Sequence, residues 1–233
     1  MHGADPINKV KPPSALQTGL VTLKQVKRAL QWLVVPILGL GAVLLYWAML
    51  SPVALGLFIA LGVLAVIASI TYTMGNKPYG YQGWGDVAVF FFFGLVGVGG
   101  TFYLHTQQLS SIWLLPAMSC GSLVVGVLNV NNIRDLSADA KAGKNTIPVR
   151  FGRKTALYYH WCLITVSVVT VLVFLLYYVP TPWPYACLCM VPFLLRHGMA
   201  IGRQGPAQLT EQLRGLVLTT LVFVVLLSVG LAL

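Results

Sequence analysis

The feature that most constrains the fold of this chain is a series of apolar runs, each long enough to cross a membrane as a helix. Seven such runs can be drawn, at residues 31–50, 53–73, 85–104, 110–130, 157–179, 183–200 and 213–233. About 30 Å of hydrocarbon requires about 20 apolar residues in a helix, whereas a barrel strand needs only about 10 residues of alternating pattern. The runs therefore predict an all-α, polytopic transmembrane helical bundle.

The composition excludes a water-soluble protein, because 58% of the residues are hydrophobic and only 9% are charged. A soluble domain carries charge on about a quarter of its residues. No repeat and no low-complexity linker divides the chain, so we expect one transmembrane domain over residues 1–233. Residues 1–30 contain no apolar signal core and are interpreted as an arm in front of the first span.

The basic residues separate cleanly between the two sides of the predicted bundle. If seven spans alternate in direction, all 15 Lys and Arg residues fall on one side, in residues 1–30, 74–84, 131–156 and 196–214. An excess of basic residues marks the cytoplasmic side and favours contact with anionic lipid. We therefore expect these four segments to face the cytoplasm. The chain has no soluble domain that would carry nucleic-acid binding.

The acidic residues and the possible metal ligands restrict the chemistry further. All five acids lie on the predicted cytoplasmic side, and none lies near the middle of a span, which argues against an ion-coupled transporter. The four cysteines lie in apolar runs without metal-ligand spacing, and the four histidines are scattered along the chain. We therefore expect any chemistry at the cytoplasmic rim, and no metal site built from cysteine or histidine.

The segment NNIRDLSADAKAGKNT, within the predicted 131–156 connection, carries the first candidate site. Asp135 and Asp139 are four residues apart, so they share one face of a helix, with Asn131 one turn earlier and Asn132 beside it. Carboxylate and amide oxygens suit Mg²⁺. The cations that follow suit phosphate oxygens, and they are Lys141, Lys144, Arg150 and Arg153. The pattern fits either a metal-bound phosphate site or an ordinary solvated loop with salt bridges.

A second segment, YTMGNKPYGYQGWGD at residues 72–86, lies on the same predicted side. Glycines allow backbone turns that other residues resist, and four of them interrupt this segment: Gly75, Gly80, Gly83 and Gly85. Its other notable residues are one cation, one carboxylate and three aromatic side chains: Lys77, Asp86, Tyr79, Tyr81 and Trp84. The aromatic residues could simply form an interfacial belt. The glycine spacing favours a folded lid over a site.

Together these segments resemble the UbiA superfamily of intramembrane aromatic prenyltransferases, and within it the 1,4-dihydroxy-2-naphthoate polyprenyltransferases of menaquinone synthesis. NNIRDLSADAKAGKNTIPVRFG is similar to that family's second aspartate-rich motif, and YTMGNKPYGYQGWGDVAVFFFFG to its loop-and-helix signature. The arm KPPSALQTGLVTLKQVKRAL resembles the segment after the family's first aspartate-rich motif. The resemblance extends over essentially the whole chain.

The resemblance implies a nine-helix fold in a bacterial cytoplasmic (inner) membrane, with two aspartate motifs facing each other at its cytoplasmic end. In such a fold Mg²⁺ ions hold a polyprenyl diphosphate and stabilise the departing diphosphate. A ring carbon of 1,4-dihydroxy-2-naphthoate then attacks the allylic cation, and loss of carbon dioxide gives demethylmenaquinone. The implied partners are therefore polyprenyl diphosphate, 1,4-dihydroxy-2-naphthoate and membrane lipid.

The family's site residues carry over by position in the two motifs. Asp135 and Asp139 are expected to bind Mg²⁺, supported by Asn131 and Asn132. The residues expected to bind the diphosphate are Lys77, Arg134, Lys144 and Arg150. The residues expected to hold or activate the aromatic acceptor are Tyr79, Tyr81 and Asp86.

The chain departs from the family pattern at its start. The family has two further helices and an N-D-x-x-D motif before this point, and of that motif only HGAD is present, with Asp5 matching its last acid. We therefore expect seven of the nine helices and half of the metal site. Two alternatives stay open: a catalytically silent fragment or isoprenoid-binding membrane protein, and a UbiA-type enzyme for another aromatic acceptor.

Overall fold

The computed structural model describes residues 18–233, so Asp5 and the basic residues Lys9 and Lys11 lie outside the described part. The described residues form helices and no strands. The chain divides into two compact units, residues 1–60 and 61–233. Among the described residues, seven helical runs are long and apolar enough to span a membrane. This result confirms the prediction of an all-α bundle with seven spans, and the protein is an integral membrane protein.

The first unit contains α1 (Leu23–Trp47) and the beginning of α2 (Pro52–Thr73). A reciprocal capping box starts α1: the Thr22 side chain accepts a bond from the Gln25 N–H at 3.3 Å, and the Gln25 side chain accepts one from the Thr22 N–H at 2.8 Å. The sequence TLKQ at residues 22–25 has this capping spacing. The helix therefore begins well before the apolar run that predicted it.

The second unit begins within α2 and continues through a span that changes helix type twice. This span consists of α3 (Gly85–Val89), the π-helix η2 (Phe90–Val96) and α4 (Gly97–Thr106). Its π-helix packs directly on the backbone of α5 (Leu114–Arg134), because a Cβ atom added to Gly94 would lie 2.9 Å from the Cα atom of Gly121. The absence of both side chains allows this close approach.

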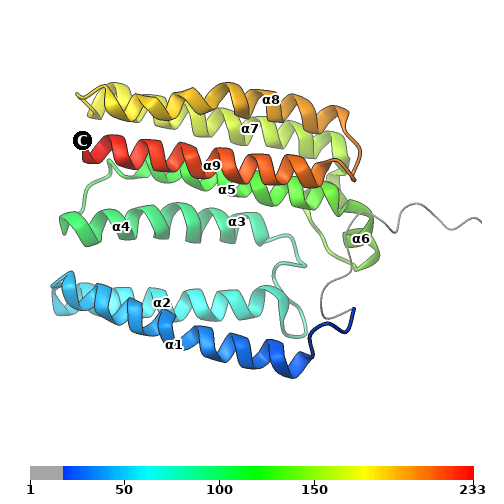
Figure 1. The fold of residues 1–233 in the computed structure, drawn as a ribbon, viewed down its shortest axis with the longest axis horizontal. Helices are drawn as coiled ribbons and strands as arrows, with labels where there is room; N and C mark the ends of the chain where they lie inside the picture. Colours follow the sequence, from blue (N-terminus) through cyan, green and yellow to red (C-terminus); the bar gives the residue numbers. More distant parts are fainter. Residues whose placement is uncertain (1–17) are drawn as a thin grey trace, which may run out of the picture. The chain divides into compact units, whose positions relative to one another are not determined.

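The centre of the second unit is α5, which contacts η2, α7 (Ile147–Tyr178) and α9 (Leu209–Ala232). Figure 1 shows α5 between α4 on one side and α7 and α9 on the other. Two buried polar contacts join α5 to α7: the Ser119 and Ser167 hydroxyl oxygens lie 2.9 Å apart, and the Asn129 amide donates to the Ala156 carbonyl oxygen at 2.9 Å. These contacts satisfy polar groups that lipid could not.

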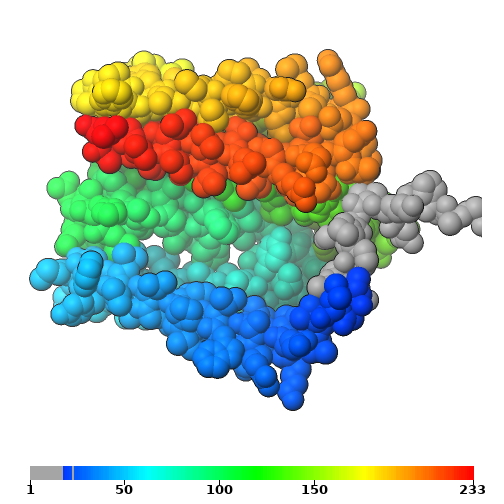
Figure 2. Space-filling view, in the orientation of Figure 1, coloured from blue at the N-terminus to red at the C-terminus, as the bar shows by residue number. Residues whose placement is uncertain are grey.

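The remaining span consists of the 3₁₀-helix η3 (Trp183–Met190) followed by α8 (Val191–Arg203). α9 contacts both, and Figure 2 shows α8 and α9 side by side on one face. A Cβ atom on Gly230 would lie 2.5 Å from the Pro184 backbone, so α9 is packed directly on the start of η3. The second unit therefore has one continuous core of α5, α7, α8 and α9 with η3.

Helix ends within the second unit differ from the expected boundaries. The expected 131–156 connection is shorter, because α5 continues to Arg134, α6 occupies Leu136–Lys141 and α7 begins at Ile147. Pro148 suits the first turn of a helix, and Gly152 then interrupts α7 with a φ of 81°. The apolar run could not reveal these polar helical turns.

The last turn of α8 also differs from the boundary predicted from the sequence. α8 continues to Arg203, so Arg196 lies inside a span rather than in a connection. The histidines that the sequence left scattered include one pair, His160 and His197, whose buried rings lie 5.2 Å apart. Among the described residues no group of three histidine, cysteine or acidic side chains could hold a metal, so this pair does not amount to such a cluster.

Candidate functional site

The two loops singled out in the sequence meet at one end of the second unit. The Asn145 N–H donates to the Tyr81 carbonyl oxygen at 2.7 Å, which joins the glycine-rich loop to the loop before α7. Gly83 has a φ of 90°, and a Cβ atom there would lie 2.6 Å from the Asn145 carbonyl oxygen. Only glycine fits this position, so the glycine spacing encodes a tight backbone contact between the loops.

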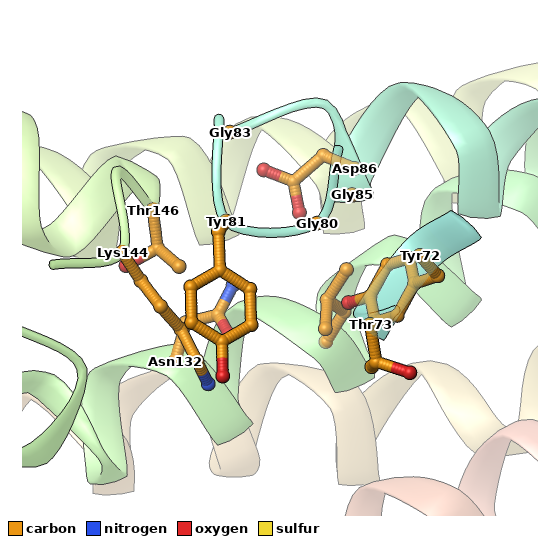
Figure 3. Close-up of a pocket in the computed structure, with 11 residues that line it drawn as sticks. Tyr72, Thr73, Gly80, Tyr81, Gly83, Gly85, Asp86, Asn132, Lys144 and Thr146 are labelled. Atoms are coloured by element: carbon orange, nitrogen blue, oxygen red, sulfur yellow. The ribbon is translucent and has the colours of Figure 1, made fainter. Parts of the chain in front are cut away.

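A pocket of about 100 Å³ lies at this junction. Figure 3 shows the side chains of Tyr81, Asn132 and Lys144 gathered on one side, and Tyr72 and Thr73 on another. The remaining lining residues come from the same loops and from α5: Gly80, Gly83, Gly85, Asp86, Leu128 and Thr146. The pocket therefore combines the end of α2, the glycine-rich loop, the start of α3, the end of α5 and the loop before α7.

Lys144 connects the pocket to the aspartate motif. Its Nζ atom lies 2.7 Å from the Asp139 Oδ1 atom and 5.2 Å from the centre of the Tyr81 ring. Burial lowers the pKa of Lys144, but the hydrogen bond and the negative charge of Asp139 outweigh it, so the pKa lies above its ordinary value. The ammonium group is therefore charged and held at the rim of the pocket by a carboxylate that is itself only 5% exposed.

The second carboxylate of the motif pairs with a different cation. Asp135 lies between α5 and α6, and both of its oxygens accept bonds from the Arg134 guanidinium at 2.8 Å. The same guanidinium donates to the Asn131 side-chain oxygen at 2.6 Å. Asp135 and Asp139 remain one turn apart, since the Asp139 N–H donates to the Asp135 carbonyl oxygen at 2.8 Å. The motif therefore forms two ion pairs, as the solvated-loop interpretation also expected.

The residues present fit one part of a magnesium site. Asp139 accepts its ion pair through Oδ1, which leaves the second carboxylate oxygen for a further ligand. Asp135, Asn131 and Asn132 provide further oxygens in the eight residues that precede Asp139. Mg²⁺ commonly takes only one or two carboxylates from a protein and completes its octahedron with water and substrate phosphate. The oxygen-only donor set fits that chemistry.

Asp86 is the carboxylate of the pocket itself. Its Oδ1 atom is buried and has no hydrogen-bond partner among the described residues, and the side chain lines the pocket. A buried polar atom without a partner is costly, and such atoms often mark a place where a ligand binds. Asp86 is thus positioned to accept a hydrogen bond from a bound molecule.

Besides Asn131, Arg134, Asp135 and Asp139 of the aspartate motif, three of the residues expected at the site lie outside the pocket lining. Tyr79 packs edge-on against Tyr72, with ring centres 5.4 Å apart, and burial raises the pKa of its phenol. Lys77 is exposed, and its carbonyl oxygen accepts a bond from the Gln82 side chain at 3.0 Å. Arg150 is also exposed, with its guanidinium carbon 5.1 Å from the centre of the Phe151 ring. Their roles stay predictions.

The sequence analysis missed four lining residues: Tyr72, Thr73, Leu128 and Thr146. Tyr72 and Thr73 end an apolar span, and Thr146 precedes α7 as its N-cap residue. Tyr72, Thr73 and Thr146 lie within the quoted motifs, so the motifs themselves were the available signal. Leu128 gave no signal, because its apolar side chain does not differ from others in its span.

The fold and this junction define an intramembrane protein with a small polar pocket at one end of its helices, built from two polar loops. The chain belongs to the UbiA prenyltransferase family, whose model matches residues 3–214. It is similar to two proteins named 1,4-dihydroxy-2-naphthoate octaprenyltransferase. The Haemophilus influenzae protein is 38% identical over 98% of this chain and 75% of its own length. The Escherichia coli protein is 38% identical over 96% of this chain and 74% of its own length.

A third relative matches a shorter part of the chain. A Mycobacterium tuberculosis protein of the same name is 37% identical over 75% of this chain and 59% of its own length. No solved structure matches the chain. The sequence comparisons therefore establish the family, and the arrangement of the site rests on the geometry described above.

Proposed function

We propose that this protein transfers a polyprenyl group from a polyprenyl diphosphate to 1,4-dihydroxy-2-naphthoate, in the pathway to menaquinone. The bacterial relatives named above for this reaction support the choice of substrates. The observation that carries the proposal is the junction of the two loops, which brings the Asp139–Lys144 pair and the Asp86 carboxylate to one pocket. A diphosphate requires a cation such as Lys144, and an aromatic acceptor with hydroxyl groups requires a hydrogen-bond acceptor such as Asp86, and the two must lie in the same place.

Binding of the diphosphate falls to the cations of the aspartate motif. Lys144 lies at the pocket rim, where Asp139 maintains its charge. Arg134, the last residue of α5, provides a planar guanidinium group. Both cations suit phosphate oxygens, and a charged donor forms hydrogen bonds about twice as strong as a neutral one. Asp135, Asp139, Asn131 and Asn132 would hold Mg²⁺, which, when bound, neutralises charge on the departing diphosphate.

The acceptor is held by the other side of the pocket. The Tyr81 ring provides an apolar face beside Lys144, and the Asp86 Oδ1 atom is placed to accept a hydrogen bond from an acceptor hydroxyl. That bond increases electron density in the ring, which forms the new carbon–carbon bond as the allylic carbon–oxygen bond breaks. When the ring attacks from the carbon that bears the carboxylate, carbon dioxide leaves, and the electron pair of the broken carbon–carbon bond restores the aromatic ring.

A direct assay tests this proposal. The full chain is purified in detergent and incubated with a polyprenyl diphosphate, 1,4-dihydroxy-2-naphthoate and Mg²⁺, and prenylated product is measured by mass spectrometry. We expect product that falls at least tenfold in Lys144→Gln, while Lys27→Gln, which removes an exposed lysine in the first unit, serves as the matched control. Product from hydroxybenzoate but not from dihydroxynaphthoate would indicate another acceptor. Diphosphate binding without any product would favour the isoprenoid-binding alternative.

The proposal places this pocket on the cytoplasmic side of the bacterial inner membrane. The basic loops carry the charge that marks this side, and the connection around Gln107 carries none. We therefore expect a membrane-impermeant thiol reagent to label Gln107→Cys but not Ala142→Cys in intact cells, in a background without the native cysteines. Labelling of position 142 alone would reverse the orientation.

A further inference from the structure

A second cavity lies away from the candidate active site, between α7 and α8. It has a volume of about 350 Å³, and it is lined by Lys154, Leu157, Tyr158, Trp161, Gly198, Met199, Gly202 and Arg203. We call this cavity the α7–α8 groove. None of its residues lines the pocket at the loop junction, and all of them belong to the second unit.

The shape of the groove comes from two glycines of α8. A Cβ atom on Gly198 would lie 2.8 Å from the Trp161 indole, so this ring rests on the backbone of α8 and closes the inner end. A Cβ atom on Gly202 would meet nothing within 4 Å, so the groove is open at that position. Arg153 donates hydrogen bonds to the carbonyl oxygens of Ile201 and Gln204 and thereby ties the two helices together at the outer end.

The charge of the groove is positive and has no counter-ion in the described part of the chain. Lys154 and Arg203 contribute one cation from each helix, and neither forms an ion pair among the described residues. The carboxylates of residues 18–233 lie elsewhere: Asp135 and Asp139 are paired in the aspartate motif, Glu211 pairs with Arg214, and Asp86 lines the other pocket. The groove therefore favours an anionic ligand.

The order of side chains along the groove specifies what kind of anion fits. Lys154 lies near the beginning of α7 and Arg203 at the end of α8, so both cations lie at the same end of the bundle as the polar loops (Figure 1). Tyr158 and Trp161 follow within seven residues, which is about 10 Å along a helix. Tyr158 and Met199 are 65% and 52% exposed, so the wall that continues from the cations is apolar and accessible.

We propose that the α7–α8 groove binds an anionic phospholipid, with the phosphate between Lys154 and Arg203 and an acyl chain along Tyr158, Trp161 and Met199. Cations at the rim, aromatic rings below them and an apolar wall beyond match the order of phosphate, glycerol and acyl chain in a lipid. A free phosphate would use only the two cations and would leave the apolar wall without a function. The groove thus selects lipid by charge at one end and by apolar contact along its length.

Two variants test the proposal from opposite directions. Lys154→Gln/Arg203→Gln removes the charges and keeps the shape, whereas Gly202→Leu keeps the charges and fills the open position. Each has a matched control: Lys27→Gln/Arg28→Gln removes one exposed lysine and one exposed arginine at the start of α1, and Gly215→Leu adds a side chain to an open helical glycine of α9. Circular dichroism and thermal unfolding confirm that each variant is folded.

The measurement is native mass spectrometry of the full chain, delipidated and then supplied with equal amounts of phosphatidylglycerol and phosphatidylcholine. We expect the unmodified protein to retain phosphatidylglycerol, the charge variant to lose this preference at least tenfold, and Gly202→Leu to lose the bound lipid. Both controls should behave like the unmodified protein. Unchanged retention in either test variant would overturn the proposal. Displacement of the lipid by inorganic phosphate would also overturn the proposal. So would detection of a dimer without bound lipid, because a second copy of the chain would then occupy the groove.

Discussion

Replacing Gly83 by alanine tests whether the contact between the two loops sets the geometry of the candidate active site. The substitution adds one methyl group at a position with a φ of 90°, where the new carbon would lie 2.6 Å from the Asn145 carbonyl oxygen. Asn145 is the residue whose N–H donates to the Tyr81 carbonyl oxygen, and Lys144 precedes it directly. The added methyl group therefore pushes on the segment that carries the proposed diphosphate cation.

The expected size of the effect follows from these distances. Ordinary contact of a Cβ atom begins near 3.4 Å, so the loops must separate by about 0.8 Å. A displacement of about 1 Å near reacting groups lowers rates by on the order of 10²-fold. The left-handed backbone adds strain of about 1–2 kcal/mol for any residue with a side chain. We therefore expect kcat/KM of prenyl transfer to fall about 10²-fold.

Gly75 provides the control for the strain. Its φ of 107° is also unfavourable for alanine, but a Cβ atom there would meet nothing within 4 Å. Gly75→Ala should therefore lower kcat/KM by tenfold at most, with thermal unfolding of both variants measured in the same detergent to detect a general loss of structure. Equal losses of kcat/KM in Gly75→Ala and Gly83→Ala would refute the reasoning, because the loop contact would then contribute nothing beyond backbone strain.

Three further predictions follow from the contacts described above. Asp139→Asn should lower product formation at saturating Mg²⁺ by about 10²–10³-fold, while Glu211→Gln, whose ion pair is exposed, should leave it unchanged; near-normal turnover of the first variant would contradict its role. Ser119→Ala and Ser167→Ala should show a coupling of about 0.6 kcal/mol in a double-mutant cycle of unfolding, and additive effects would argue against their hydrogen bond. Burial lowers the pKa of Lys144, but Asp139 raises it by more, so the pKa in the folded protein lies above that in the unfolded chain. The ion pair therefore stabilises the fold fully at pH values below the unfolded pKa and is lost as the pH rises through the folded pKa. The difference in unfolding free energy between the unmodified protein and Lys144→Gln should stay constant from about pH 6 to about pH 9 and shrink only at higher pH.

The architecture was largely predictable from the sequence, because the requirement to cross a membrane is a requirement on length and polarity. Each of the seven apolar runs corresponds to a span in the described chain. The helix ends were harder to predict, since polar turns such as Asn131–Arg134 and the residues after Thr146 are helical without being apolar. Pro148 and Gly152 mark the start and the interruption of α7, but neither follows from hydropathy.

The candidate site was predictable in its parts and less so in its connections. The motif spacing identified Asp139, Lys144 and Asp86, and the structure brings all three to one loop junction. The motif spacing could not show that Asp135 pairs with the adjacent Arg134 while Asp139 pairs with Lys144, because the choice of partner depends on the turn between α5 and α6. The contribution of Tyr72 likewise depends on how the glycine-rich loop folds back onto the end of α2, where the Gly80 N–H donates to the Tyr72 carbonyl oxygen at 3.2 Å.

The π-helix Phe90–Val96 has a consequence for how this sequence can change over time. A π-helical turn contains about one residue more than an α-helical turn of 3.6 residues. Deleting one of the four phenylalanines of this segment would therefore convert it to an ordinary α-helix and leave the direction of the residues beyond it nearly unchanged, because the surplus residue is the one that the π-helical turn accommodates. Gly94 could then still face Gly121, whose missing side chain permits the close packing on α5. A relative that has lost one residue within Phe90–Val96 should therefore keep both glycines, whereas a deletion in the α-helical part Gly97–Thr106 would rotate the residues beyond it by about 100° and should be rarer.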